Sequence, residues 1–391
     1  MTEEELYDEE LEETDASSYL KNKISKEAEK MLIKAAESGG EDSKTKYIPT
    51  GNVGADLAFS DGQGLPKGAS ILLWAEPGCG KTTLIVDIAL RLLKMHKKKK
   101  VPFKVLYLAV EGSRQLLYSM GAGPYIESKD FFYVEQPLTW QNVEVFYDAV
   151  LKGHPLYKDV KMIVIDSVQN VLSKANLEKS VQDGDFGTRS KERTNFYSKY
   201  LPLCKSLGVT NFLVSQVRQR QDAGLYDDKQ KAAASWGDRH NVDIILKCSR
   251  RTSQDDKIEV KTVFGTYTDS NKFILTLSSK GQDCKNRYIP GNKSEILIEQ
   301  GVGAHNEYAL KKMLTSNKLL IQKGSWYLFN EQLCSALKIE AKNLRGTDVD
   351  QIIIDKEVEI IKFLKDAECY CIKPVLANKA KEEKAKAEKA K

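Results

Sequence analysis

Ala75-Glu76-Pro77-Gly78-Cys79-Gly80-Lys81-Thr82-Thr83 is the stretch of this chain that decides its fold. An apolar run from Ala69 to Trp74 precedes it and predicts a buried strand. Leu84 to Leu90 follows with apolar residues at the spacing of a helix that packs on that strand. A strand, a glycine-rich loop and a helix in this order are typical of a loop that binds nucleotide phosphates.

The residue types in this loop fit that chemistry. Its glycines let backbone N–H groups turn toward an anion, and the start of the following helix adds a partial positive charge. Lys81 is expected to reach the β- and γ-phosphates, and the Thr82 hydroxyl to ligate Mg²⁺. Because Ala75 replaces the first glycine of the usual pattern, an ordinary glycine-rich turn remains the alternative. The expected cofactors are ATP and Mg²⁺, and the expected nucleotide-binding residues are Glu76, Pro77, Gly78, Cys79, Gly80, Lys81, Thr82 and Thr83.

Length and composition limit the classes of protein to which this chain can belong. With 391 residues, 41% of them hydrophobic and 29% charged, the chain has the composition of a globular protein of about two to three domains. Its seven cysteines form no Cys-x-x-Cys pair, which favours a reducing cytoplasm over a disulfide scaffold or a zinc site. No apolar run approaches the ~20 residues of a membrane span, and the N-terminus is acidic, unlike a signal peptide. We therefore expect a cytoplasmic protein with no membrane partner.

Four segments are expected along the chain. Residues 1–45 hold an acidic tail and, over Ser17–Glu37, an amphipathic oligomerisation helix that could pack on its own core or on a neighbouring subunit. Residues 46–290 form the core, residues 291–370 a small C-terminal domain and residues 371–391 a lysine-rich tail. The two charged ends are expected to be solvated, although the basic end could instead contact nucleic acid or an acidic surface.

Alternating strands and helices predict an α/β core with a parallel or mostly parallel twisted sheet. Arg250–Asp269 is expected to form a hairpin or surface excursion. The C-terminal region is expected to contain a strand over Glu295–Glu299 and one long helix over Asp350–Ala367. The strands expected in the core are Ser70–Trp74, Lys104–Val110, Lys161–Asp166, Thr210–Ser215, Asn241–Cys248 and Lys272–Ser279.

Three apolar strands each end in a residue suited to nucleotide chemistry. Asp166 would hold Mg²⁺ or a water bound to it, or would merely begin a turn. Glu111 would accept a proton from an attacking water or orient that water, unless it is a helix-capping acid that faces solvent. Gln216 would hydrogen-bond the γ-phosphate or a water and so distinguish ATP from ADP, unless it is a polar turn residue. The carboxyl ends of parallel strands share one edge of a sheet, so all three can surround one nucleotide.

These features, in this order, resemble the RecA recombinase family from about Ile48 to Leu328. The resemblance implies a RecA-like ATPase core in which Glu111, Lys81 and Gln216 serve catalysis and Asp166 with Thr82 holds the metal. It also implies that Tyr118 stacks on adenine. The stretches that carry it are Ile48-Pro49-Thr50-Gly51, Gly64-Leu65-Pro66-Lys67-Gly68, Leu106-Tyr107-Leu108-Ala109-Val110-Glu111, Ile165-Asp166-Ser167-Val168 and Val214-Ser215-Gln216-Val217-Arg218.

Lys285-Asn286-Arg287 is similar to a short basic stretch of that family which reaches across a subunit interface to the neighbour's ATP. The resemblance therefore implies Lys285 and Arg287 as catalytic cations supplied by an adjacent subunit. Such cations neutralise the charge that develops on the transferred phosphoryl group. On this basis ATP lies between protomers, and hydrolysis depends on assembly.

The resemblance also implies two DNA-facing segments, Glu178–Gly187 and Arg218–Ala234, which by themselves would be interpreted as solvated loops. Phe186 would be an apolar wedge between bases. Cationic segments with an occasional apolar side chain suit single-stranded DNA, where backbone charge supplies affinity and stacking tolerates any sequence. The implied DNA-binding residues are Phe186, Arg189, Lys191, Arg193, Arg218, Arg220, Lys229 and Lys231.

The chain also departs from the family. Ala232 to His240 replaces the glycine-rich end of its second DNA-binding loop, and the C-terminal tail is lysine-rich where the family's is often acidic. These departures are more similar to phage recombinases of the UvsX type than to bacterial ones, which would place the protein in a host cytoplasm. The expected function is ATP-dependent homologous pairing and strand exchange by a filament on single-stranded DNA. The alternatives are a ring-forming helicase or regulatory ATPase, and a scaffold that binds ATP only to assemble.

Overall fold

The computed structural model describes residues 45–371 except 113, 174–187, 220–229, 233–235, 252–257, 263–264, 270, 282 and 341. The acidic tail, the helix expected at Ser17–Glu37 and the lysine-rich tail lie outside the described residues. The chain divides into two compact units, Met1–Lys46 and Tyr47–Lys391, and the second contains the elements discussed below. Among the helices that the structure describes, none combines the length and the hydropathy needed to cross a bilayer.

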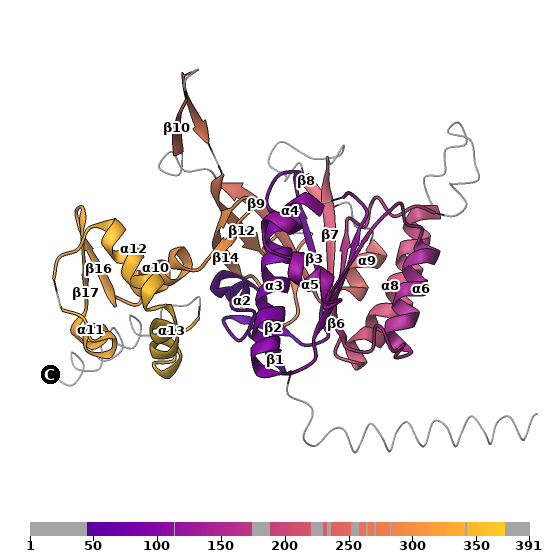
Figure 1. Ribbon diagram of the computed structural model, residues 1–391, viewed down its shortest axis with the longest axis horizontal. Helices are drawn as coiled ribbons and strands as arrows, with labels where there is room; N and C mark the ends of the chain where they lie inside the picture. The colour runs from indigo at the N-terminus through magenta and orange to yellow at the C-terminus, as the bar shows by residue number, and fades with distance from the viewer. Residues whose placement is uncertain are drawn as a thin grey trace, which may run out of the picture. The chain divides into compact units, whose positions relative to one another are not determined.

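A large sheet dominates the second unit (Figure 1). Its strand order is β15-β14-β12-β9-β3-β7-β6-β4-β5. The six strands from β9 to β5 run parallel. The strands β12, β14 and β15 continue the sheet in antiparallel register. In chain order the strands are β3 (Ser70–Ala75), β4 (Lys104–Ala109), β5 (Phe131–Glu135), β6 (Val160–Asp166), β7 (Thr210–Gln219), β9 (Ile244–Arg251), β12 (Lys272–Ser278), β14 (Lys293–Glu299) and β15 (Gly303–His305).

Helices cover both faces of this sheet, because side chains of a strand point alternately to opposite sides. Ile71 and Leu73 of β3 join the apolar cluster under α3, whereas Leu72 and Trp74 join the cluster under α6 and α8. Figure 1 shows the two helical layers on either side of the strands. The first layer contains α2 (Val53–Ser60), α3 (Lys81–Lys99), α4 (Arg114–Ser119) and α5 (Gly123–Glu127), and the second contains α6 (Trp140–Leu151), α8 (Thr188–Ser206) and α9 (Trp236–Asn241).

The predicted α/β fold with a mostly parallel sheet is confirmed, and each strand expected in the core is present with shifts of at most a few residues at its ends. The hairpin expected within Arg250–Asp269 is present as the antiparallel pair β10 and β11. The edge strand β5 was not predicted, since its run of aromatic residues is short and only half-buried. The remaining short strands are β1 (Tyr47–Ile48), β2 (Leu65–Pro66), β8 (Gln230–Ala232), β10 (Ile258–Thr262), β11 (Gly265–Asp269) and β13 (Lys285–Asn286).

The C-terminal region differs from expectation in two respects. The strand expected at Glu295–Glu299 is present as β14, but it pairs with β12 and extends the main sheet, because an apolar strand pattern does not name its partner. The single helix expected over Asp350–Ala367 is two helices separated at Lys356. Val349 of the first helix and Ile360 of the second both belong to one apolar cluster. The elements around that cluster are α10 (Glu307–Ser316), β16 (Leu320–Lys323), β17 (Trp326–Phe329), α11 (Glu331–Leu337), α12 (Gly346–Asp355) and α13 (Glu357–Asp366).

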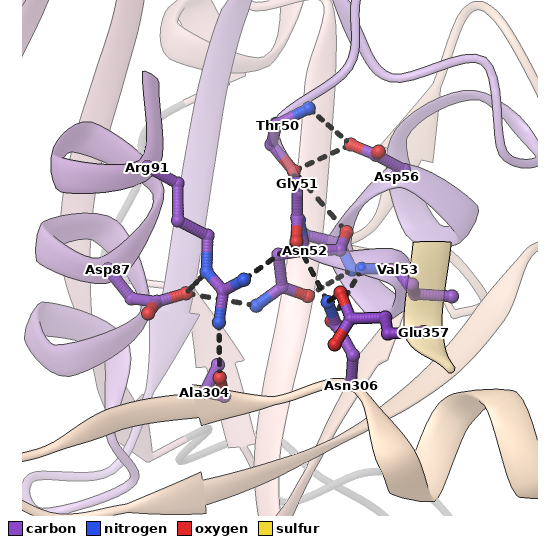
Figure 2. Close-up of polar contacts among 11 residues, drawn as sticks. Thr50, Gly51, Asn52, Val53, Asp56, Asp87, Arg91, Ala304, Asn306 and Glu357 are labelled. Carbon is purple, nitrogen blue, oxygen red and sulfur yellow. Dashed lines mark hydrogen bonds and ion pairs between the residues drawn. The ribbon is translucent and has the colours of Figure 1, made fainter. Parts of the chain in front are cut away.

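A partly buried polar cluster connects α3 with the residues before α2 and with β15 (Figure 2). Arg91 of α3 donates hydrogen bonds to Asp87 (2.8 Å), to the carbonyl of Gly51 (2.8 Å) and to the carbonyl of Ala304 (2.6 Å). Asn306 donates to the same Gly51 carbonyl at 2.9 Å and to Glu357 at 2.8 Å. Helix α3 is thereby connected to β15, and α13 is connected to the residues before α2.

A carboxyl group beside this cluster makes stability depend on pH. Thr50 donates to Asp56 Oδ1 from its backbone nitrogen (3.0 Å) and from its hydroxyl (2.6 Å). Burial nevertheless raises the pKa of Asp56 to about 7, compared with ~3.9 in an unfolded chain. Between these values the folded state binds more protons than the unfolded state. The free energy of unfolding therefore falls as the pH rises through this interval.

We expect Asp56→Asn to remove this loss of stability, on the order of 2–3 kcal/mol between pH 5 and pH 8. An asparagine keeps an oxygen that accepts from Thr50, but it does not ionise on burial. Denaturant unfolding at four pH values across the interval measures the slope. Asp61→Asn is the matched control, because Asp61 is a partly exposed carboxylate that ends the same helix. A slope in Asp56→Asn equal to that of the wild type would contradict the assignment.

Candidate active site

The loop between β3 and α3 has the backbone expected of an anion site. Gly78 (φ +73°) and Gly80 (φ +85°) adopt the left-handed conformation that side chains rarely permit. A Cβ on Gly80 would lie 2.8 Å from the ring of Phe273, so the loop also needs glycine there for space. A Cβ on Gly78 would meet nothing within 4 Å, which leaves room above the loop for a ligand. Helix α3 then begins at Lys81 and directs its first N–H groups toward that space.

Lys81 lies at the centre of this loop with only 7% of its surface exposed. Its ammonium group donates hydrogen bonds to the carbonyls of Ala75 (3.1 Å) and Glu76 (2.9 Å). Ala75 is the last residue of β3 and is itself buried. The alanine that replaces the first glycine of the usual pattern therefore continues the strand and supplies a carbonyl that orients the lysine.

The hydroxyl of Thr82 and the carboxylate of Asp166 meet beside this lysine. Thr82 Oγ1 donates a hydrogen bond to Asp166 Oδ2 at 2.7 Å, and the Tyr107 hydroxyl donates a hydrogen bond to the same oxygen at 2.7 Å. Burial raises the pKa of Asp166, and the two hydroxyl hydrogen bonds act in the opposite direction. A hydroxyl and one carboxylate fit Mg²⁺, which prefers oxygen ligands and completes its shell with phosphates and water. The two residues predicted as metal ligands are thus side by side.

Glu111 follows β4 at the same edge of the sheet, and its backbone nitrogen donates to the carbonyl of Asp166 at 3.2 Å. Its Oε1 accepts hydrogen bonds from Gln216 (2.7 Å), from Asn170 (2.8 Å) and from the hydroxyl of Ser167. Glu111 and Gln216, predicted separately from two strand ends, are therefore in direct contact. Ser167 and Asn170 were not predicted, although both lie within four residues of Asp166, where the sequence already indicated a site.

One further residue borders the loop, and one residue expected to bind the nucleotide lies on α4. Arg250, at the carboxyl end of β9, was not predicted: its guanidinium lies 4.1 Å from the ring centroid of Phe273 and 3.5 Å from the carbonyl oxygen of Gly78. In the sequence, only the pair of arginines at the end of β9 indicated that a cation could lie at this position. Tyr118, expected to stack on adenine, lies on α4 with 49% of its surface exposed, and Gly123 packs against its ring.

Lys285 and Arg287 do not lie at the loop between β3 and α3 of their own chain. Arg287 donates to Asp243 (3.1 Å) and to the carbonyl of His240 (2.8 Å), and Lys285 of β13 is the backbone partner of Ile245 of β9. These contacts lie at the amino ends of β3 and β9. At a rise of ~3.3 Å per residue, the two ends of β3 are roughly 17 Å apart. Burial, with Arg287 nearby, lowers the pKa of Lys285 to about 8.

The residues expected to bind DNA are only partly described. Phe186, Arg220 and Lys229 lie outside the described residues. Arg218 lies on β7, the strand that contains Gln216, and is the backbone partner of Lys231 in the pairing of β7 with β8. Of the residues on α8, Arg189 lies in its first turn and Lys191 is exposed. Arg193 is only 7% exposed, since its position on α8 faces the protein interior, so we do not retain it as a DNA ligand.

Comparison with known proteins supports the same core. A family model described as an AAA domain matches residues 62–222, which include the loop, Glu111, Asp166 and Gln216. The chain is 22% identical over 288 residues to a protein RecA of Laribacter hongkongensis, covering 73% of each chain. It is 21% identical over 346 residues to a mitochondrial DNA repair protein recA homolog of Dictyostelium discoideum, covering 87% of this chain and 68% of the relative. Together with the fold, these matches support a RecA-like family for the chain, as its motifs predicted.

Proposed function

We propose that this protein is a DNA-dependent ATPase that forms filaments on single-stranded DNA and promotes homologous pairing and strand exchange. A RecA-like ATPase core supports nucleotide hydrolysis in general. The observation that carries the finer proposal is the contact between Glu111 and Gln216. Gln216 touches the candidate base and lies on the strand that continues into Arg218, so one strand joins the ATP site to a candidate DNA segment.

Each side chain of the site has a separate role in the proposed hydrolysis. The loop N–H groups and the Lys81 ammonium bind the phosphates, and Lys81 opposes the charge that develops on the γ-phosphoryl group. Glu111 orients a water in line with the γ-phosphorus and takes its proton as the bond to the β-γ bridging oxygen breaks, so that ADP and phosphate leave. When bound, Mg²⁺ neutralises phosphate charge, and Thr82 and Asp166 are the residues that would hold it. Gln216 releases Glu111 when it turns toward the γ-phosphate.

Lys285 and Arg287 complete the site of an adjacent subunit in this proposal. Both lie at the amino ends of the parallel strands, whereas the loop of their own chain follows the carboxyl end of β3. A head-to-tail filament brings the amino ends of the strands in one subunit to the carboxyl ends of the strands in the next. An assembly with one subunit type then forms a site at every interface. Hydrolysis would accordingly depend on filament formation.

Arg287→Ala is expected to lower the DNA-stimulated rate roughly 10-fold or more, with Lys285 left as the second cation. Mixing it with Glu111→Gln should restore about a quarter of the wild-type rate, because about one interface in four then joins an intact Glu111 to an intact Arg287. Steady-state ATPase assays on the separate and mixed variants measure this. Lys205→Ala is the control, since Lys205 also pairs with Asp243 (2.8 Å) but is expected to leave the rate unchanged. Rates that merely average on mixing would exclude a shared site.

The proposed function is tested by ATPase measurements with and without single-stranded DNA, together with electron microscopy of the same samples. We expect the rate to rise with DNA, and helical filaments to form when ATP and DNA are both present. A strand-exchange assay with homologous and heterologous duplexes then tests pairing. Closed rings would favour the helicase or regulatory ATPase. Filaments without measurable hydrolysis would favour the scaffold, and either result would overturn the proposal.

A further inference from the structure

Tyr107 lies directly beneath the candidate metal site. It is in the middle of β4 and is fully buried. Its ring packs against Phe131 (centroids 5.9 Å apart) and Tyr133 (6.0 Å) of β5. Its hydroxyl donates a 2.7 Å hydrogen bond to Asp166 Oδ2. A phenol placed inside an apolar layer needs a partner for its proton, and here that partner is a residue of the site itself.

The geometry gives this hydroxyl a specific effect on the carboxylate. Asp166 Oδ2 accepts from Thr82 and from Tyr107, each at 2.7 Å, and Asp166 is only 4% exposed. One donor from α3 and one from β4 fix the rotation of the carboxylate about its Cβ–Cγ bond. Thr82 is itself a candidate ligand, whereas Tyr107 is held from below by ring packing. The phenol is therefore the donor that keeps its place whichever way the threonine hydroxyl turns.

We propose that Tyr107 is a positioning residue for the divalent cation: its hydroxyl orients the Asp166 carboxylate and thereby sets the affinity for the nucleotide-bound metal. This inference rests on the proposed function, in which Thr82 and Asp166 hold that metal. Groups that hydrogen-bond to a metal ligand commonly change metal affinity by roughly 10- to 100-fold when removed. The other residues of β4 on this face, Val105 and Ala109, are apolar. A residue that only filled the core at position 107 would not need a hydroxyl group.

Tyr107→Phe deletes this hydroxyl and keeps the ring packing. We expect the affinity for Mn²⁺, measured by electron paramagnetic resonance in the presence of ADP, to fall roughly 10-fold. The Mg²⁺ concentration that gives half-maximal ATPase activity should rise by a similar factor, while the rate at saturating Mg²⁺ recovers. The Mn²⁺ titration needs no turnover, so it reports on the cation site separately from catalysis.

Tyr147→Phe is the matched control. Tyr147 is also fully buried, and its hydroxyl donates a 2.8 Å hydrogen bond to Asn211 in the apolar cluster on the other face of the sheet. Both variants should lose a similar amount of thermal stability, but only Tyr107→Phe should weaken Mn²⁺ binding. Wild-type Mn²⁺ affinity in Tyr107→Phe, or an equal loss in Tyr147→Phe, would overturn the inference.

Thr82→Val separates this inference from the function on which it rests. If Thr82→Val weakens Mn²⁺ binding and Tyr107→Phe does not, the cation site stands and only the role of Tyr107 is refuted. If neither variant changes Mn²⁺ affinity, the cation is not held at Thr82 and Asp166, and the proposed site itself is wrong. Weakening in both variants supports the two proposals together.

Discussion

Lys81→Ala should lower ATP hydrolysis by roughly 10²-fold or more, with or without DNA. Lys81 is the side-chain cation at the centre of the loop, where the carbonyls of Ala75 and Glu76 hold it. Alanine leaves the loop N–H groups to bind phosphate but removes the charge that opposes the developing negative charge on the γ-phosphoryl group. The rate at saturating ATP and the affinity for a fluorescent ATP analogue should both be measured, because the lysine contributes to binding and to turnover.

The control for this variant must separate chemistry from folding. Lys94→Ala removes a lysine from the same helix at an exposed position beyond the loop, and it should keep the wild-type rate and melting temperature. Lys81→Ala leaves two carbonyls without a donor and is expected to lose roughly 1–3 kcal/mol of stability, which circular dichroism can detect while the protein stays folded. Hydrolysis by folded Lys81→Ala within a few-fold of the wild type would show that this loop is not the site of ATP chemistry.

The parts of the site that the sequence predicted are those at strand ends. Asp166 ends β6, Glu111 follows β4, and Gln216 lies on β7 opposite Ala75, the last residue of β3. Parallel strands bring their carboxyl ends to one edge of the sheet, so the strands predicted from the sequence already implied the proximity of these residues. The structure adds the pairings: Thr82 with Asp166, and Gln216 with Glu111. Sequence alone could not supply these pairings, because it does not give the order in which β3, β7, β6 and β4 lie side by side.

The parts that were missed depend on tertiary contacts. Tyr107 lies within an apolar strand, and only the register of β4 with β6, in which Tyr107 is opposite Val164, brings its hydroxyl near Asp166. Arg193 was grouped with exposed cations by its neighbours in the sequence, but the packing of α8 buries it. The antiparallel extension through β14 was also missed, since the alternation of apolar residues predicts a strand without naming its partner. These errors share one cause: local patterns specify elements, whereas burial and pairing specify functional contacts.

Glu111→Gln should lower hydrolysis roughly 10²- to 10⁴-fold and leave nucleotide binding nearly unchanged. The amide keeps an oxygen for Ser167, Asn170 and Gln216 but does not take a proton from water. Because bound ATP then persists, filaments on single-stranded DNA should outlast those of the wild type. Single-turnover hydrolysis and the lifetime of filaments after dilution measure the two effects separately.

Glu135→Gln is the matched test of whether Glu111 is the base. Glu135 ends the adjacent strand β5, opposite Ala109 of β4, and pairs with Arg114 at 3.3 Å. It thus presents a second carboxylate at the same edge of the sheet, but none of the hydrogen bonds described for Glu111 reaches it. If the base function requires the position of Glu111, Glu135→Gln should hydrolyse ATP at nearly the wild-type rate. An equal loss of hydrolysis rate in the two variants would mean that the negative charge at this edge matters and that no single carboxylate acts as the base. A wild-type rate in Glu111→Gln would remove Glu111 from the mechanism.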